Sequence, residues 1–226
     1  MLRRNRKRQF VRRNRPRRAK LSSDEGCNRK RAGGGAMNFN PDPALGFAWL
    51  VFLGYWLIAR FSVNRMARPE PGATLLLRIL IMVGAYWLLF RQDPRFGILN
   101  RRWIPRDDRI VLAGVLLTWS GVAFAIWARY HLGRFWSATV ALREGHQLIR
   151  SGPYANIRHP IYTGMLTAVL GTTLAVGRYR ALVAFVVILA GFIAKSRQEE
   201  KLLDAQCGPA FEDHRRHTGF FLPRRS

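Results

Sequence analysis

Long apolar runs alternate with arginine-rich connectors along most of this chain. The runs are apolar on all sides of a helix rather than along one stripe, which is typical of segments buried in a membrane and not of a soluble bundle. A helix needs about 20 residues to cross a hydrocarbon core about 30 Å thick. The pattern predicts five membrane-spanning helices, over Leu45–Phe61, Ala73–Phe90, Ile110–Trp127, Ile161–Gly177 and Ala181–Ala194.

The last two runs are short and almost continuous, since only three residues, Arg-Tyr-Arg, follow Gly177 before the next run begins. We expect them to form a tight helical hairpin whose two open ends return to the same membrane face. Trp and Tyr at the ends of the first three runs suit the membrane–water interfaces. The predicted fold class is therefore all-α, a polytopic integral membrane protein of about five transmembrane helices with a C-terminal helical hairpin.

The net charge of +25 suggests nucleic acid at first, but the charge is unevenly distributed. Residues 1–36 hold 14 Lys and Arg against two acidic residues, show no apolar periodicity and end in a glycine-rich stretch. We predict a basic disordered tail over 1–36 and a membrane domain over 37–226. The tail has three interpretations: a tether for anionic lipid or nucleic acid, a plain solvated tail, or an extension upstream of a true start at Met37.

From Met37 onward, Lys and Arg are more numerous in the connectors on the side of the C-terminus than on the other side. The positive-inside rule then puts the C-terminus in the cytoplasm. The basic tail would reverse this bias, which favours the third interpretation. We expect membrane lipids and no nucleic acid as partners, and the compact, arginine-rich composition favours a bacterial inner membrane.

Metal-ligating patterns are weak in this sequence. His214 and His217 lie three residues apart with no third ligand nearby, so we expect a surface helix there and no metal site. Cys27 and Cys207 are the two cysteines, and one lies in the tail, which argues against a structural disulfide. The phosphate-binding and dinucleotide-binding glycine motifs are absent from the sequence.

The densest group of chemically useful residues is GHQLIRSGPYANIRHPIYTG, over residues 145–164. Gly and Pro predict a turn before Tyr154. The residue before a proline avoids helical geometry, so His159 should be extended and Pro160 should open the fourth helix. Arg158, His159 and Tyr162 then stand at a helix N-terminus, which favours an anionic ligand group. The alternative is an interfacial anchor built from Arg and Tyr.

A second polar group, in AKSRQEEKLL, directly follows the fifth apolar run. If the last two helices form a hairpin, Glu199 and Glu200 return to the face that carries Arg158 and His159. A carboxylate there can accept hydrogen bonds from hydroxyl or ammonium groups. The alternative is a solvated helix start in which Glu200 pairs with a neighbouring cation.

Together these segments resemble the isoprenylcysteine carboxyl methyltransferase family and the related phospholipid methyltransferases. The shared elements are H-x-L-[VI]-x-x-G-x-Y over His146–Tyr154, R-H-P-x-Y-x-G over Arg158–Gly164, and E-E-x-x-L from Glu199, followed by Gly208 and Phe211. The resemblance covers about residues 105–223. It implies a methyltransferase that binds S-adenosyl-L-methionine in a cytoplasmic pocket and acts on a lipophilic small-molecule or prenylated acceptor.

The resemblance also implies roles for individual residues. Arg158, His159 and Glu199 would be catalytic. The cofactor pocket would be lined by His146, Gln147, Leu148, Ile149, Tyr154, His159, Pro160, Ile161, Tyr162, Glu199 and Glu200. Lys195, with Arg197 as its rival, would contact the acceptor. Family members that act on a carboxylate carry Arg at the position of Lys195, and a lysine cannot form the planar two-bond contact of an arginine.

The nature of the acceptor is open at this point. A carboxylate is ionised near neutral pH and needs no base, whereas an amine, such as that of a phospholipid headgroup, must first lose a proton. This difference favours O-methylation of a lipophilic carboxylate over N-methylation. An NADPH-dependent reductase of the sterol type, which shares a similar R-H-P-x-Y element, is a second alternative. A membrane scaffold with a basic tether is the non-enzymatic one.

Overall fold

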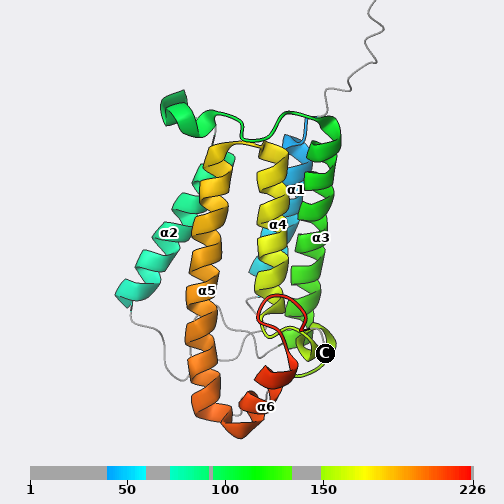
Figure 1. The fold of residues 1–226 in the computed structure, drawn as a ribbon, viewed down its shortest axis with the longest axis vertical. Coiled ribbons are helices and arrows are strands. Elements are labelled where there is room, and N and C mark those ends of the chain that lie inside the picture. Colours follow the sequence, from blue (N-terminus) through cyan, green and yellow to red (C-terminus); the bar gives the residue numbers. More distant parts are fainter. Residues whose placement is uncertain (1–39, 60–71, 92–93, 134–148, 225–226) are drawn as a thin grey trace, which may run out of the picture. The chain divides into compact units, whose positions relative to one another are not determined.

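The computed structural model describes residues 40–59, 72–91, 94–133 and 149–224, which form helices, short 3-10 turns and coil without a β-strand (Figure 1). The predicted tail and the boundary at residue 36 lie outside the described residues. The α-helices are α1 (Asp42–Ala59), α2 (Gly72–Phe90), α3 (Asp108–Leu132), α4 (Pro160–Val176), α5 (Tyr179–Cys207) and α6 (Pro209–His217). The all-helical prediction is confirmed for the described part of the chain.

Three of these helices, α1, α3 and α5, are long and apolar enough to cross a membrane. Helix α4 and the stretch Leu76–Phe90 of α2 are apolar but shorter. Apart from Gly177, which ends α4, the described residues of all five predicted runs lie in helices. The helices therefore suit an integral membrane protein.

Helix α5 is longer than predicted. The prediction ended it at Ala194, where the apolar run ends, whereas the helix continues to Cys207. The extra residues, KSRQEEKLLDAQC, include many good helix formers such as Lys, Glu, Gln and Leu, so propensity carries the helix beyond its apolar part. The expectation that the Glu pair follows the helix is wrong, and both carboxylates project from its continuous C-terminal half. Figure 1 shows this half extending past the start of α4.

The turn between α4 and α5 forms the predicted hairpin. Gly177 ends α4 with φ 62°, a left-handed geometry that suits glycine. The Arg102 side chain lies against this turn and donates to the Val176 carbonyl at 3.3 Å. Arg178 donates to the Asn100 carbonyl at 2.7 Å. Two arginines at this end of the helices thus bind backbone carbonyls of the turn and of the segment before α3.

Helices α3 and α4 pack closely through small residues. A Cβ atom on Gly121 would lie 2.3 Å from the Ala168 backbone nitrogen, and one on Gly164 would lie 2.5 Å from the Ala125 nitrogen. Gly114 and Gly171, each about two turns further along its helix, make similarly close backbone contacts. Small residues let helix backbones approach in this way inside membranes. The Thr118 and Thr172 hydroxyls, 3.2 Å apart, join the two helices across the same seam.

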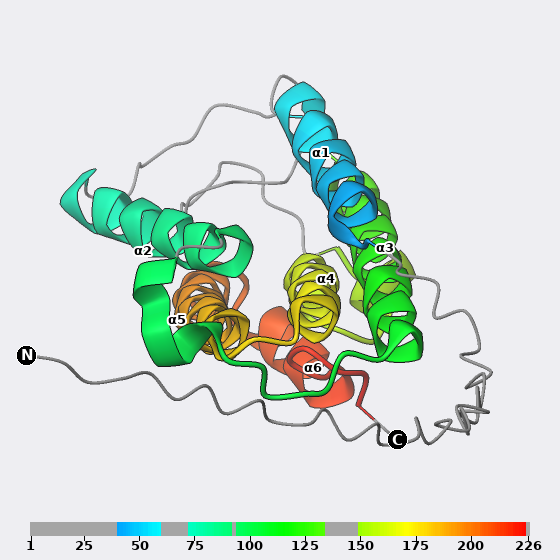
Figure 2. The same cartoon turned by 90° about the horizontal axis from the view of Figure 1, so that it is seen from above.

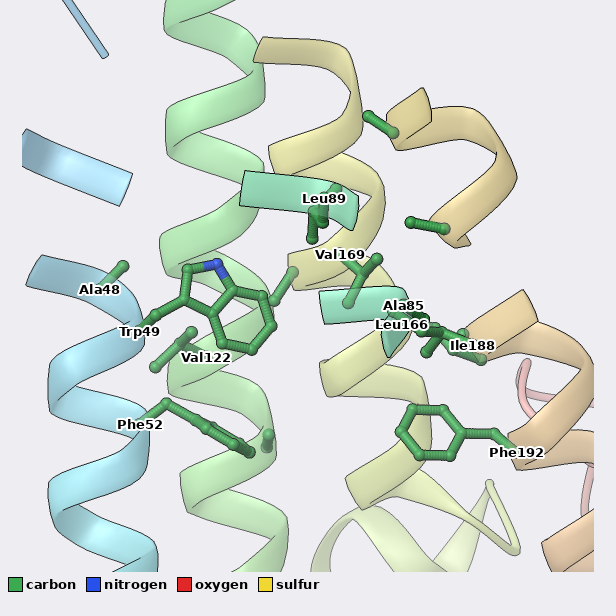
Figure 3. Close-up of a cluster of buried hydrophobic side chains, with 14 residues drawn as sticks. Ala48, Trp49, Phe52, Ala85, Leu89, Val122, Leu166, Val169, Ile188 and Phe192 are labelled. Atoms are coloured by element: carbon green, nitrogen blue, oxygen red, sulfur yellow. The ribbon is translucent and has the colours of Figure 1, made fainter. Parts of the chain in front are cut away.

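The other helices pack on either side of this pair in the order α2, α5, α4, α3 and α1 (Figure 2). On one side, the indole nitrogen of Trp49 in α1 donates to Thr172 at 3.1 Å. Figure 3 shows Trp49 and Phe52 among the buried side chains that fill the centre, together with Ile188 and Phe192 from α5. This packing holds the start of α4 and the end of α5 in place.

The close contact of α3 and α4 predicts unequal effects of two Gly-to-Ala changes. Gly121→Ala forces a methyl group into the backbone of α4 and should lower the free energy of unfolding by about 1–3 kcal/mol. Gly84→Ala in α2 has no atom within 4 Å of the new methyl group, and helix propensity should make it neutral or stabilising by up to about 1 kcal/mol. Thermal unfolding in detergent compares the two, and equal melting temperatures would contradict this packing.

Candidate functional site

The segment before α4 has the turn and the helix start that its sequence predicts, but His159 is not in the extended conformation expected of it. Gly152–Ala155 forms a 3-10 turn, His159 precedes the helix with φ −124° and ψ 58°, and Pro160 opens α4. Gly152 has φ 56°, and a Cβ atom there would lie 2.3 Å from the His131 ring. The turn is therefore pressed against the end of α3, and this contact helps to fix the start of α4.

Glu200 joins the start of α4 to the projecting half of α5. Its Oε1 atom accepts from Arg158 Nε at 2.6 Å and lies 3.1 Å from His159 Nε2. The side chains of Arg158 and Glu200 are only 13% and 17% exposed, and that of His159 is 6% exposed. The expected meeting of the Glu pair with Arg158 and His159 is confirmed as a contact.

Glu199 forms the second half of the same group. The Tyr162 hydroxyl donates to its Oε1 atom at 2.6 Å, and His159 Nδ1 lies 3.7 Å from its Oε2 atom. Lys195 Nζ lies 3.9 Å from Glu199 and 5.5 Å from the centre of the Tyr162 ring. Two carboxylates, an imidazole, a phenol and an ammonium group are thus gathered at the membrane end where α4 begins.

The C-terminal segment Thr218–Phe221 covers this group, and the sequence analysis did not anticipate its role. The Arg158 and His159 amides donate to the Gly219 and Phe220 carbonyls at 2.9 and 3.3 Å. The His159 and Phe220 rings are 5.0 Å apart. Arg158 Nη1 also donates to the carbonyls of Arg215 and Thr218. The aromatic pair after a basic helix, GFF, was the only sequence signal for this cover.

The remaining predicted pocket residues are placed as follows. Pro160 and Ile161 are buried in the first turn of α4, and Ile149 is half-buried where the described chain resumes. Tyr154 is buried, and burial raises the pKa of its hydroxyl well above the usual value, with the Glu199 charge adding to the rise. Arg197 is exposed, two residues beyond Lys195 on a different face of α5. His146, Gln147 and Leu148 lie outside the described residues.

Arg78 is a further residue that the sequence analysis missed. It lies in α2, and its Nη2 atom donates to Gln198 Oε1 at 2.8 Å, next to Glu199 in sequence. The sequence feature that could have singled it out is its position as a lone charge inside an apolar run, which in membrane segments often marks a functional residue.

An apolar groove lies between α1 and α2 and reaches α4. Its volume is about 620 Å³, and its lining includes Trp49 and Phe52 of α1, Val83 and Tyr86 of α2, and Met165 of α4. Met165 is three residues from Tyr162, so the two side chains lie on neighbouring turns of α4. The groove therefore comes within about one helical turn of the polar group. In the described chain, no cluster of three His, Cys, Asp or Glu residues suits a metal ion.

Comparison with known proteins gives a family for the segment that carries these contacts. The model of the isoprenylcysteine carboxyl methyltransferase (ICMT) family matches residues 114–205, which include Arg158, His159 and the Glu pair. The resemblance predicted from the motifs is confirmed over this segment. The ICMT segment runs from α3 through α4 to the projecting half of α5.

Three relatives share about a hundred residues with this chain. The cobalt-zinc-cadmium resistance protein CzcN of Cupriavidus metallidurans is 37% identical over 101 residues, which are 42% of this chain and 44% of that protein. The nickel-cobalt-cadmium resistance protein NccN of Alcaligenes xylosoxydans is 32% identical over 101 residues, 42% and 45% of the two chains. The protein-S-isoprenylcysteine O-methyltransferase of Schizosaccharomyces pombe is 29% identical over 99 residues, 42% of each chain. The chain thus spans less than half the length of these relatives.

The Glu200 contact predicts a large effect of a small change. Glu200→Gln removes the charge that pairs with a mostly buried Arg158, and should destabilise the ICMT segment by about 3–5 kcal/mol. Glu212→Gln in α6 is the matched control, because Glu212 pairs with the exposed Arg215 and Arg216 and should cost about 1 kcal/mol or less. Thermal unfolding and proteolysis of the C-terminal segment measure both. Equal effects would show that Glu200 makes only a solvated ion pair.

Proposed function

We propose that this chain is an S-adenosyl-L-methionine-dependent membrane methyltransferase that O-methylates the carboxylate of a lipophilic, isoprenylcysteine-like acceptor. The observation that carries the proposal is the polar group around Glu199 and Glu200, which lies within the segment matched by the ICMT family. In this proposal the chain crosses the bilayer five times, and the pocket opens on the cytoplasmic side.

The residues of this group suit the cofactor chemically. A carboxylate such as Glu199 can bind the cofactor's ammonium group. The buried side chains of Tyr154, His159 and Ile161 suit an adenosine moiety. The proposal also assigns His146, Gln147, Leu148 and Ile149 to its binding, on the strength of the motif that they share with the family. Ser196, one turn before Glu200, is fully buried, and its hydroxyl has no hydrogen-bond partner among the described residues. A polar ligand would satisfy that hydroxyl.

The proposed methyl transfer depends on the alignment of cofactor and acceptor more than on proton transfer. When bound, the cofactor supplies a sulfonium methyl group, which passes to a carboxylate oxygen and leaves a methyl ester and the neutral thioether S-adenosylhomocysteine. The acceptor carboxylate is already ionised, so the chain needs no general base. Its residues instead hold the two reactants in line and exclude water. The cover formed by Thr218–Phe221 supports the second task.

In this proposal Arg158 acts as a positioning residue. Its guanidinium group bonds to Glu200 and to two carbonyls of the C-terminal segment. These contacts hold the first turn of α4 against α5 and the cover. Glu199 and His159 are then the residues that would contact the reacting groups.

The acceptor would approach from within the membrane. Its apolar chain fits the groove beside Met165, and its anionic head would lie near Lys195, the ammonium group of the cluster. N-methylation of an amine is the alternative. It needs a base to remove a proton, and both ring nitrogens of His159, the residue best placed for that role, already face carboxylates.

A transfer assay tests the proposed reaction. Membranes that contain the protein are incubated with S-adenosylmethionine labelled in its methyl group and a membrane lipid extract, and the lipid product is then treated with base. A methyl ester releases its label as volatile methanol, and that release is the expected result. Label that survives base treatment marks N-methylation and contradicts the carboxylate acceptor. Membranes with the Glu199→Ala variant provide the background.

Glu199→Ala should weaken the binding of S-adenosylhomocysteine while leaving expression intact. The loss of a charge-assisted hydrogen bond is on the order of 1–3 kcal/mol, or about 5- to 150-fold in Kd. Asp204→Ala, an exposed acid further along the same helix, is the matched control and should leave Kd unchanged. Titration calorimetry measures both variants. An unchanged Kd for Glu199→Ala would make Glu199 a structural residue only.

Lys195→Ala should reduce turnover with little effect on cofactor binding. Loss of a close charge partner of the acceptor costs about 2–4 kcal/mol, a drop in kcat/KM of about 30- to 1,000-fold. Arg197→Ala, on the exposed face, is the comparison that tests the rival anion contact. If Arg197→Ala loses the activity and Lys195→Ala keeps it, the acceptor approaches from the other face of α5. Full activity in both variants contradicts an anionic contact on this helix.

A further inference from the structure

Arg78 is the only charged residue in the sequence of α2, GATLLLRILIMVGAYWLLF. It lies six residues into the helix, about 9 Å from its start at a rise of 1.5 Å per residue. A charged side chain at such a position is costly unless it snorkels to the interface or meets a partner. Its partners therefore indicate what it is for.

The contacts of Arg78 lead to the candidate site. Its guanidinium group donates to Gln198 on α5 at 2.8 Å, and Gln198 stands directly before Glu199. Glu199 in turn accepts from the Tyr162 hydroxyl at 2.6 Å. Lys195 lies over the ring of the same tyrosine. A cation of α5 thus lies beside the Tyr162–Glu199 pair, and a cation of α2 contacts the residue directly before Glu199.

The charges of the site require more than Lys195 if an anion is to bind. Glu199 and Glu200 are both acidic, and a third carboxylate placed beside them is repelled unless a cation compensates. Arg158 is already bonded to Glu200 and to backbone carbonyls. Lys195 is a point charge held 3.9 Å from Glu199. A guanidinium group provides the planar, two-bond geometry that matches a carboxylate.

We propose that Arg78 binds the carboxylate of the acceptor, with Lys195 as the second cation. This assignment rests on the proposed function and names the residue that takes over the role of the arginine missing at position 195. It also gives the single charge of α2 a role. Val83 and Tyr86 on the same helix line the apolar groove. One helix then contacts both the anionic head and the apolar chain of the acceptor.

The test compares two probes that differ only in charge, N-acetyl-S-farnesylcysteine and its carboxamide. Their dissociation constants are measured on detergent-solubilised protein saturated with S-adenosylhomocysteine. The proteins are the wild type, Arg78→Gln, Arg78→Lys and the control Arg109→Gln, an exposed arginine at the far end of α3. The Kd of S-adenosylhomocysteine is measured for each protein as a check on folding.

We expect the wild type and Arg109→Gln to bind the carboxylate about tenfold or more tightly than the carboxamide. Arg78→Gln should weaken carboxylate binding about 10- to 100-fold, the usual range for hydrogen bonds to charged groups, and change carboxamide binding less than about threefold. Arg78→Lys keeps the charge but loses the planar contact, and should fall between the two.

Unchanged carboxylate binding in Arg78→Gln overturns the proposal and leaves the methyltransferase function in place. So does a wild type that binds both probes equally. If Arg78→Gln no longer binds S-adenosylhomocysteine, Arg78→Lys decides, and carboxylate binding within about twofold of the wild type overturns the proposal. A wild type that binds no S-adenosylhomocysteine contradicts the proposed function itself.

Discussion

The ion contact of Glu200 with Arg158 and His159 is the interaction on which the rest of the candidate site depends. It joins residues 42 positions apart, at the start of one apolar helix and the far half of the next. Because all three side chains are largely buried, removing one partner leaves an uncompensated buried charge and costs far more than breaking a surface ion pair. Glu199, Tyr162 and Lys195 are aligned as a consequence.

The helical packing supplies this contact. Close approach of α3 and α4 through glycine holds α4 in place, and the tight turn at Gly177 returns α5 along it. A helix of 29 residues following one of 17 must extend beyond it. The extension carries the acidic pair past the start of α4, and the chain after α6 then comes back to cover it. The length difference of two helices thus creates the site.

Local rules predicted the parts of the site that depend on neighbouring residues. Pro160 fixed the start of α4, and the short link after Gly177 fixed the hairpin, so the meeting of Glu200 with Arg158 was foreseeable. The length of α5 was not foreseeable from hydropathy, because the apolar run ends at Ala194 whereas residues that favour a helix continue to Cys207. Arg78 and Phe220 reach the site only through tertiary packing. A lone charge in α2 and an aromatic pair near the C-terminus do not reveal their partners in sequence.

Equilibrium binding of S-adenosylhomocysteine and of NADPH to the detergent-solubilised protein tests the central claim most directly. The motif R-H-P-x-Y with a later acidic pair is compatible with either cofactor, whereas the pocket proposed around Glu199 is suited to an ammonium group. The account predicts binding of S-adenosylhomocysteine at nanomolar to micromolar concentration and no binding of NADPH. Binding of NADPH alone would contradict it and identify the site as that of a reductase.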